Sequence, residues 1–85
     1  MKIMKFYASW CEPCKMLTKV FEDVKNKNLL DIPVEDINIE ENTEMAIKYM
    51  VRSVPTTIIV DGDGEVIRKK IGMMMEGDLL DFVKG

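Results

Sequence analysis

The chain contains no histidine and only two cysteines among its 85 residues. A structural zinc site usually needs four ligands, drawn mostly from cysteine and histidine side chains. One copy of this chain supplies only half of such a set, so a zinc site would require two copies. We therefore expect no metal site in the single chain, and no bound metal in its function.

Basic residues are not in excess, and long apolar runs are missing. Lysine and arginine number 12 against 15 aspartates and glutamates, which gives a formal net charge of −3. This balance provides no excess of positive charge with which to bind nucleic acid. No apolar segment approaches the roughly 18 residues of a membrane span, and lysines interrupt the apolar run at residues 1–6, which has no cleavage site of small residues. We expect a soluble, cytoplasmic protein that binds neither nucleic acid nor a membrane.

Length and apolar content point to one small core. A chain of 85 residues that is 47% hydrophobic is typical of one domain, and it buries roughly 60–65% of the surface that the unfolded chain exposes. Neither a linker nor an internal repeat interrupts the pattern. We therefore expect residues 1–85 to form a single domain.

The two cysteines lie three positions apart in the segment WCEPCK, residues 10–15. Residues at this spacing on a helical turn have Cβ atoms about 5–6 Å apart, so a disulfide can form with little backbone movement. Cys11 is expected at a helix N-terminus, where free N–H groups and the helix dipole stabilise a thiolate, and Cys14 lies one turn further in. We therefore expect Cys11 to attack a substrate disulfide and Cys14 to resolve the mixed disulfide. Pro13 suits the first helical turn.

A static structural disulfide is the alternative interpretation of this pair. So short a loop restrains the unfolded chain little, which weakens a purely structural role. In a cytosolic protein, a cysteine pair is also more often catalytic than structural. The residues therefore favour dithiol chemistry.

Hydrophobic periodicity and turn signals predict alternating strands and helices. The predicted strands are 3–8, 34–39, 56–60 and 65–71; the predicted helices are 13–28, a short one capped by Asn42 that contains 45–50, and a last one with apolar residues within 79–83. This order, βαβαββα, predicts an α/β fold with a four-stranded mixed sheet flanked by helices. In the first helix, the residues at helical spacing that we expect to be core are Met16, Leu17, Val20, Phe21 and Val24.

Three separated motifs together resemble the thioredoxin family. Residues 6–15, FYASWCEPCK, are similar to the family's active-site strand and helix start, with Glu12 in place of the usual glycine. Val54-Pro55-Thr56 resembles the segment that carries the family's cis-proline, and Gly72 stands where members keep a glycine near the active-site surface. The resemblance covers nearly the whole chain, and the size is similar to that of glutaredoxins and of compact thioredoxins from phages and archaea.

The resemblance implies a thiol–disulfide oxidoreductase that reduces protein disulfides and needs no bound cofactor. A thioredoxin-reductase-type or glutathione system would re-reduce it, and we expect a monomer. It also implies a cis Val54–Pro55 bond facing the cysteines, with Val54 pairing with substrate backbone. Gly72 and Met73 would belong to the substrate surface, although the methionines at 73–75 could instead form a core edge. Trp10 would face the substrate.

Two alternative functions stay open at this point. One is a glutaredoxin-like, glutathione-dependent reductase, although a CPYC-type centre and a Gly-Gly pair after the last strand are both absent from the sequence. The other is a non-catalytic binding subunit that uses the same scaffold. Replacing both cysteines with serine would separate them, because only a binding role would survive.

Lys5 and Asp36 depart from the family pattern. Thioredoxins usually carry a buried aspartate at the position of Lys5, six residues before the first cysteine, and its lysine partner at the position of Asp36. The two charges are therefore exchanged, and we expect a buried or half-buried ion pair beneath the disulfide. Asp36 would then be the proton acceptor for Cys14. The alternative is that Lys5 extends its ammonium group to solvent.

Glu12 adds a negative charge beside Cys11. At about 7 Å in water-like dielectric, this charge opposes the thiolate by roughly 0.6 kcal/mol. The helix N-terminus favours the thiolate by about 0.3–2 kcal/mol, so we expect Cys11 to remain activated. Glu12 could equally be only an exposed first-turn carboxylate that complements the helix dipole.

Overall fold

The strands and helices alternate in the predicted order βαβαββα. The computed structural model describes all residues from 1 to 85. Its elements are β1 (Lys2–Tyr7), α1 (Glu12–Asn26), β2 (Val34–Asn38), α2 (Thr43–Lys48), β3 (Thr56–Val60), β4 (Val66–Ile71) and α3 (Glu76–Lys84). Each predicted element is present, with ends that differ by one or two residues except in the short α2 and at the start of α3.

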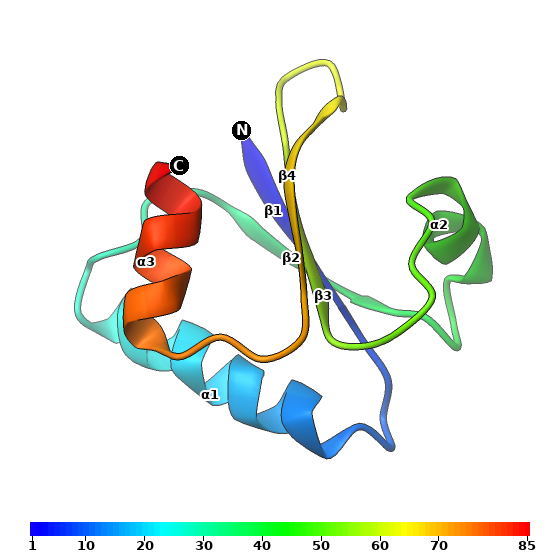
Figure 1. The fold of residues 1–85 in the computed structure, drawn as a ribbon, viewed down its shortest axis with the longest axis horizontal. Helices are drawn as coiled ribbons and strands as arrows, with labels where there is room; N and C mark the ends of the chain where they lie inside the picture. Colours follow the sequence, from blue (N-terminus) through cyan, green and yellow to red (C-terminus); the bar gives the residue numbers. More distant parts are fainter.

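The four strands form one mixed sheet in the order β2-β1-β3-β4. β1 pairs in parallel with β2 and antiparallel with β3, and β3 pairs antiparallel with β4. Helices α1 and α3 cover one face of this sheet, and α2 lies on the other (Figure 1). The predicted four-stranded α/β architecture is therefore confirmed.

Side chains from successive residues of β1 enter two different cores. Ile3 packs with Leu17, Phe21 and other residues of α1 and α3, whereas Met4 and Phe6 pack beneath α2. This division follows from the strand geometry, because neighbouring side chains point to opposite faces of a sheet. β1 is thus buried on both faces, and the loop that contains Cys11 begins where this central strand ends.

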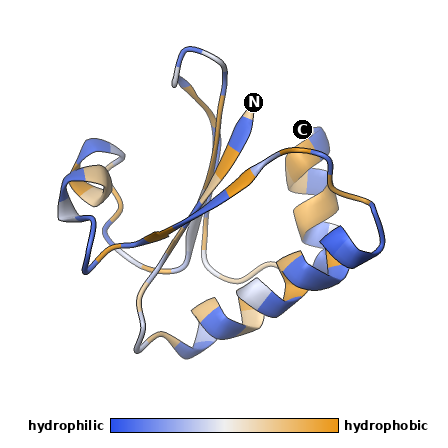
Figure 2. Ribbon diagram, turned by 180° about the vertical axis from the view of Figure 1, so that it is seen from behind, coloured by the Kyte–Doolittle hydropathy of each residue, from blue (hydrophilic) through white to orange (hydrophobic).

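Met16 is not a core residue, which corrects the sequence prediction. Its surface is 60% exposed, and Val20 is only partly buried. The buried positions of α1 are Cys14, Leu17, Phe21 and Val24. Each helical residue turns about 100°, so Met16 points about 200° away from Cys14 and faces solvent. Hydrophilic and hydrophobic positions therefore alternate along the helix in Figure 2.

The second helix is shorter than predicted. α2 ends at Lys48, so Tyr49 and Met50 follow it, and Met50 adopts a left-handed backbone with φ 56°. Asn42 occupies the N-cap position as expected, but its side chain makes no capping hydrogen bond. This brief helix covers only part of its face of the sheet.

A surface ion pair joins the end of α1 to the start of α3. Lys27 Nζ lies 2.9 Å from Glu76 Oε1. The hydrogen bond to Glu76, together with the charge of this carboxylate, raises the pKa of Lys27 above its ordinary value. The pair adds an exposed contact between the two helices that share one core.

No helix combines the length and the apolar character that crossing a membrane requires. Nor do three or more Cys, Asp or Glu side chains gather closely enough to hold a metal ion.

Candidate active site

The end of the β1–α1 loop and the first turn of α1 carry the two cysteines, which are joined in a disulfide. Their Cα atoms are 5.2 Å apart. Cys11 is the N-cap of α1, and its Sγ accepts a hydrogen bond from the N–H of Cys14 at 3.2 Å. The same N–H can stabilise a thiolate on Cys11 once the disulfide is reduced. The predicted position of Cys11 at the helix start is therefore confirmed.

Both cysteines are almost fully covered in the disulfide form. Cys11 is 4% exposed and Cys14 is 3% exposed. They form a small cluster with Ala8, against which Tyr7, Ile39 and Val54 pack. The two cysteines are therefore equally covered in this state, and the two sulfurs differ by their position at the helix end.

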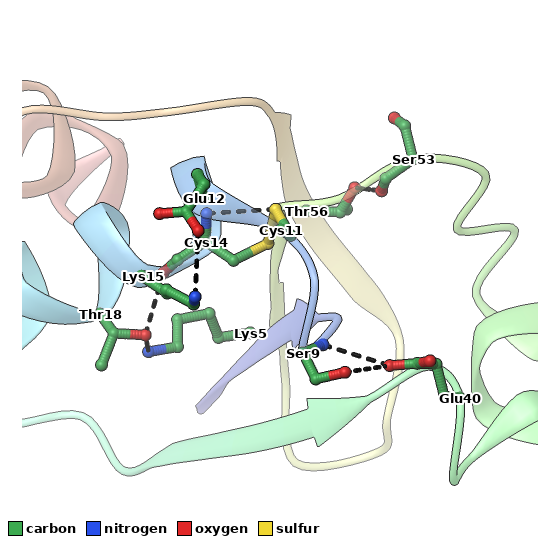
Figure 3. The surroundings of a disulfide bond; sticks show 10 residues. All are labelled: Lys5, Ser9, Cys11, Glu12, Cys14, Lys15, Thr18, Glu40, Ser53 and Thr56. Atoms are coloured by element: carbon green, nitrogen blue, oxygen red, sulfur yellow. Dashed lines mark hydrogen bonds and ion pairs between the residues drawn. A yellow bond between two sulfur atoms is a disulfide. The ribbon is translucent and has the colours of Figure 1, made fainter.

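Exposed side chains surround the covered disulfide. Trp10 is 66% exposed, and Glu12 and Pro13 are also on the surface. Lys15 Nζ lies 3.0 Å from Glu12 Oε1, one turn along the helix (Figure 3). The negative charge beside Cys11 is thus partly offset by an adjacent ammonium group, an arrangement that the sequence prediction did not include.

The Val54–Pro55 bond is cis, as the resemblance implied. Val54 packs against the cysteine cluster, so the loop before β3 lies beside the disulfide. The carbonyl of Pro55 accepts a hydrogen bond from the N–H of Gly72 at 2.8 Å. Gly72 has φ 99°, a left-handed conformation that glycine adopts without steric cost. Tertiary structure therefore brings the cysteines, the proline and the glycine to one surface.

The three consecutive methionines have three different environments. Met74 is a core residue at 1% exposure, and Met73 packs partly buried against the same core. Met75 is 62% exposed and is the N-cap of α3. Met74 confirms the core-edge alternative, and contact of Met73 with a substrate remains a prediction.

Lys5 and Asp36 form the expected ion pair. Lys5 Nζ lies 3.0 Å from Asp36 Oδ1, and the side chains are 4% and 53% exposed. The two residues are partners in the parallel register of β1 and β2. The ammonium group also lies 5.0 Å from the ring centroid of Phe21. The pair is half-buried, and the alternative in which Lys5 extends to solvent is wrong.

Thr18 links this ion pair to Cys14, and sequence reasoning missed it. Its hydroxyl accepts a hydrogen bond from Lys5 Nζ at 2.9 Å and donates one to the carbonyl of Cys14 at 3.0 Å (Figure 3). A threonine four residues after Cys14 was the available signal, because helical threonines often bond the carbonyl one turn back. Asp36, Lys5, Thr18 and Cys14 therefore form a continuous chain of contacts.

Two surface cavities follow the same chain of contacts. One, of about 270 Å³, is lined by residues that include Tyr7, Thr18 and Cys14. The other, of about 240 Å³, is lined by Tyr7, Thr18 and Asp36. Because both are lined by Tyr7 and Thr18, the cavity at Cys14 and the cavity at Asp36 are neighbours.

A second contact that sequence reasoning missed holds the active-site loop. The N–H and hydroxyl of Ser9 both donate to Glu40 Oε1, at 3.1 and 2.8 Å (Figure 3). Glu40 lies just after β2, so this contact ties the loop before Cys11 to the neighbouring strand end. Nothing in the spacing of the two residues indicated it.

Comparison with known proteins agrees with this geometry. The Thioredoxin family model matches residues 1–85. Similar proteins include the thioredoxins of Rickettsia bellii (strain RML369-C) and Rickettsia felis (strain ATCC VR-1525 / URRWXCal2), 33% and 36% identical over 81 residues, which span 95% of this chain and 76% of each relative. The solved structure of a mutant thioredoxin from Halobacterium salinarum NRC-1 is 36% identical with a TM-score of 0.84, over 96% of this chain and 70% of that one. The chain therefore belongs to the thioredoxin family, and its Cys11–Cys14 pair is the redox centre of a thiol–disulfide oxidoreductase.

Proposed function

We propose that the chain reduces protein disulfides with Cys11 as nucleophile and Cys14 as resolving thiol. The Cys11 thiolate attacks one sulfur of the substrate disulfide, forms a mixed disulfide and releases the other substrate sulfur as a thiolate, which takes up a proton. Cys14 then loses its proton and attacks the Cys11 sulfur, which releases the second substrate thiol. Two electrons pass to the substrate, and the protein ends in the disulfide state. The observation that carries this assignment is the N–H of Cys14 directed at Cys11 Sγ.

We propose that an extended substrate segment pairs with the backbone of Val54. Neither the N–H nor the carbonyl of Val54 makes a hydrogen bond within the chain. These groups lie beside the cysteine cluster, and an extended peptide can satisfy both by strand-like pairing. Pro55, Gly72 and the exposed Trp10 would form the adjoining surface, with Met73 at its margin.

Asp36 is our proposed proton acceptor for Cys14. The half-exposed carboxylate lines a cavity that shares Tyr7 and Thr18 with the cavity at Cys14, and Lys5 and Thr18 hold the arrangement in place. Asp36→Asn should slow the resolving step by about a hundredfold, the lower end of general-base effects. The Asn side chain keeps an oxygen available to Lys5, so this variant tests the proton transfer more than the fold.

The measurement is the lifetime of the mixed disulfide as a function of pH, after rapid mixing of reduced protein with a disulfide substrate. The rate of Cys11 attack in the same traces is the internal control, and it should be unchanged. An unaltered lifetime and pH profile in Asp36→Asn would remove Asp36 from the mechanism.

Glu12 should have only a small effect on the nucleophile. Glu12→Gln is expected to raise the attack rate of Cys11 by less than about threefold, because the charge effect is roughly 0.6 kcal/mol before the offset from Lys15. The rate of alkylation of Cys11 in the reduced protein measures this. A change of about tenfold would contradict this expectation, because it exceeds the charge effect of Glu12 even without any offset from Lys15.

Thioredoxins act on disulfide substrates and are reduced by a reductase system. For this chain we propose a thioredoxin-reductase-type donor, with glutathione as the second candidate, and a monomeric, cytoplasmic form. The role as a reductant is tested by the reduction potential of the Cys11–Cys14 pair, measured by equilibration with glutathione and a reference dithiol. A value near about −270 mV supports a reductant, whereas about −180 mV or higher indicates an isomerase or oxidant.

A further inference from the structure

A surface groove between the loop that follows α2 and strand β4 lies next to the proposed substrate site. It has a volume of about 430 Å³, and Met50, Val66 and Ile71 are among the residues that line it. These three side chains are 65%, 49% and 61% exposed. Helix α2, which precedes the loop, has only six residues and is the one helix on its side of the sheet (Figure 1). We call this feature the α2–β4 groove.

The α2–β4 groove is basic on a protein that is acidic overall. Arg52 and Lys69 line it, and no carboxylate does. Neither cation takes part in an ion pair. The carbonyls of Tyr49 and Met50 accept hydrogen bonds from Lys69 Nζ at 3.4 and 3.2 Å, which keeps its ammonium group at the groove. With a formal chain charge of −3, this is a local reversal of sign that attracts negative charge.

The groove is continuous with the backbone groups left free beside the disulfide. Ser53 and Thr56 line it on either side of Val54 and Pro55, and Ile71 precedes Gly72. An extended chain advances about 3.3 Å per residue. A segment paired with Val54 therefore reaches the groove within one or two residues of its cysteine.

We propose that the α2–β4 groove selects substrates whose disulfide cysteine is flanked by a large apolar residue and acidic residues. The apolar side chain would contact Met50, Val66 and Ile71, and the carboxylates would lie against Arg52 and Lys69. This inference rests on the proposed reduction of protein disulfides, and it specifies the class of substrate. The groove thus determines specificity and takes no part in the thiol exchange itself.

The test compares extended peptides of equal length, each carrying one cysteine in a disulfide with a chromogenic aryl thiol. One acidic peptide has a leucine and two aspartates before the cysteine, and the other has them after it. In the matched neutral peptides, asparagines replace the aspartates. At low ionic strength, we expect kcat/KM for the better acidic peptide to exceed that of its neutral match by about fivefold, the scale of two exposed ion pairs. High salt should reduce this preference, because it screens exposed charges.

The Arg52→Gln/Lys69→Gln double variant should lose the preference for the acidic peptide. The matched control is Lys25→Gln/Lys70→Gln, which removes the same charge from exposed sites outside the groove and should keep the preference. Replacing the leucine of the acidic peptide with alanine should also lower kcat/KM of the wild-type protein for that peptide. Equal kcat/KM for acidic and neutral peptides, or equal losses in both double variants, would overturn the proposal.

A small uncharged disulfide separates this inference from the proposed function. All variants should reduce it at the wild-type rate, because the groove takes no part in the thiol exchange. A wild-type protein that reduces no disulfide at all would contradict the proposed function, whereas normal reduction without any preference among the peptides would contradict only the role of the groove.

Discussion

Cys14→Ser is expected to accumulate a stable mixed disulfide with a protein substrate, and Cys11→Ser is expected to form none. Without Cys14, no neighbouring thiol can attack the Cys11 sulfur, so the adduct persists. Without Cys11, the remaining thiol lacks the N-cap position where the N–H of Cys14 faces the sulfur. Turnover should fall by several orders of magnitude in both variants. Non-reducing electrophoresis and mass spectrometry detect the adduct.

The Cys11→Ser/Cys14→Ser double variant is the control, and it should form no adduct and show no turnover. The stability of each variant should be compared with that of the reduced wild type. The variants cannot form the disulfide, and closing even so short a loop contributes about 2 kcal/mol to stability. Adducts of equal yield from both single variants would contradict the assigned roles. Retention of partner binding by the double variant, with no turnover by the wild type, would instead favour the non-catalytic scaffold.

Asp36→Ala is expected to lower the free energy of unfolding by about 2–3 kcal/mol, far more than Lys5→Met. Removing Asp36 leaves a buried ammonium group, 4% exposed, with only the Thr18 hydroxyl and the Phe21 ring nearby. An unpaired buried charge of this kind is costly. Lys5→Met instead leaves a carboxylate that is 53% exposed and that water can solvate, while the methionine fills the buried volume. Its effect should stay below about 1 kcal/mol.

Urea unfolding of the oxidised proteins, followed by circular dichroism, measures both values. Asp31→Ala is a matched control, since it removes an exposed carboxylate outside the ion pairs and should change stability little. The asymmetry is the informative result. Equal destabilisation by Asp36→Ala and Lys5→Met would show that the ammonium group is hydrated in solution despite its burial in the structure.

Local spacing was enough to predict the redox centre and the order of the elements. Two cysteines three positions apart at a helix start can meet whatever the rest of the fold does, so Cys11 and Cys14 were predictable from sequence. The Lys5–Asp36 pair was expected from the family resemblance, and the register between neighbouring strands then joins these two residues directly. Both contacts join residues that are close together in one helix or that lie on two adjacent strands.

The same sequence could not tell which methionines are buried. Met16 is 60% exposed and Met74 is 1% exposed, although both stand in apolar patterns. The outcome depends on how α1 is rotated about its axis and on where α3 crosses it. These are properties of the packed helices, and hydrophobic periodicity alone does not determine them.

The sequence by itself determined the dithiol chemistry, the element order and the absence of a histidine ligand, because these follow from residue type and short-range spacing. Only the tertiary structure decided that Thr18 connects Lys5 to Cys14, that Val54 has free backbone groups beside the disulfide, and that the α2–β4 groove is open and basic. The bond from Thr18 to Cys14 lies within one turn of α1, whereas the Lys5–Thr18 contact, the placement of Val54 and the groove depend on segments that are separate in the chain. Their geometry is set by how the helices and strands pack, and no local pattern encodes it.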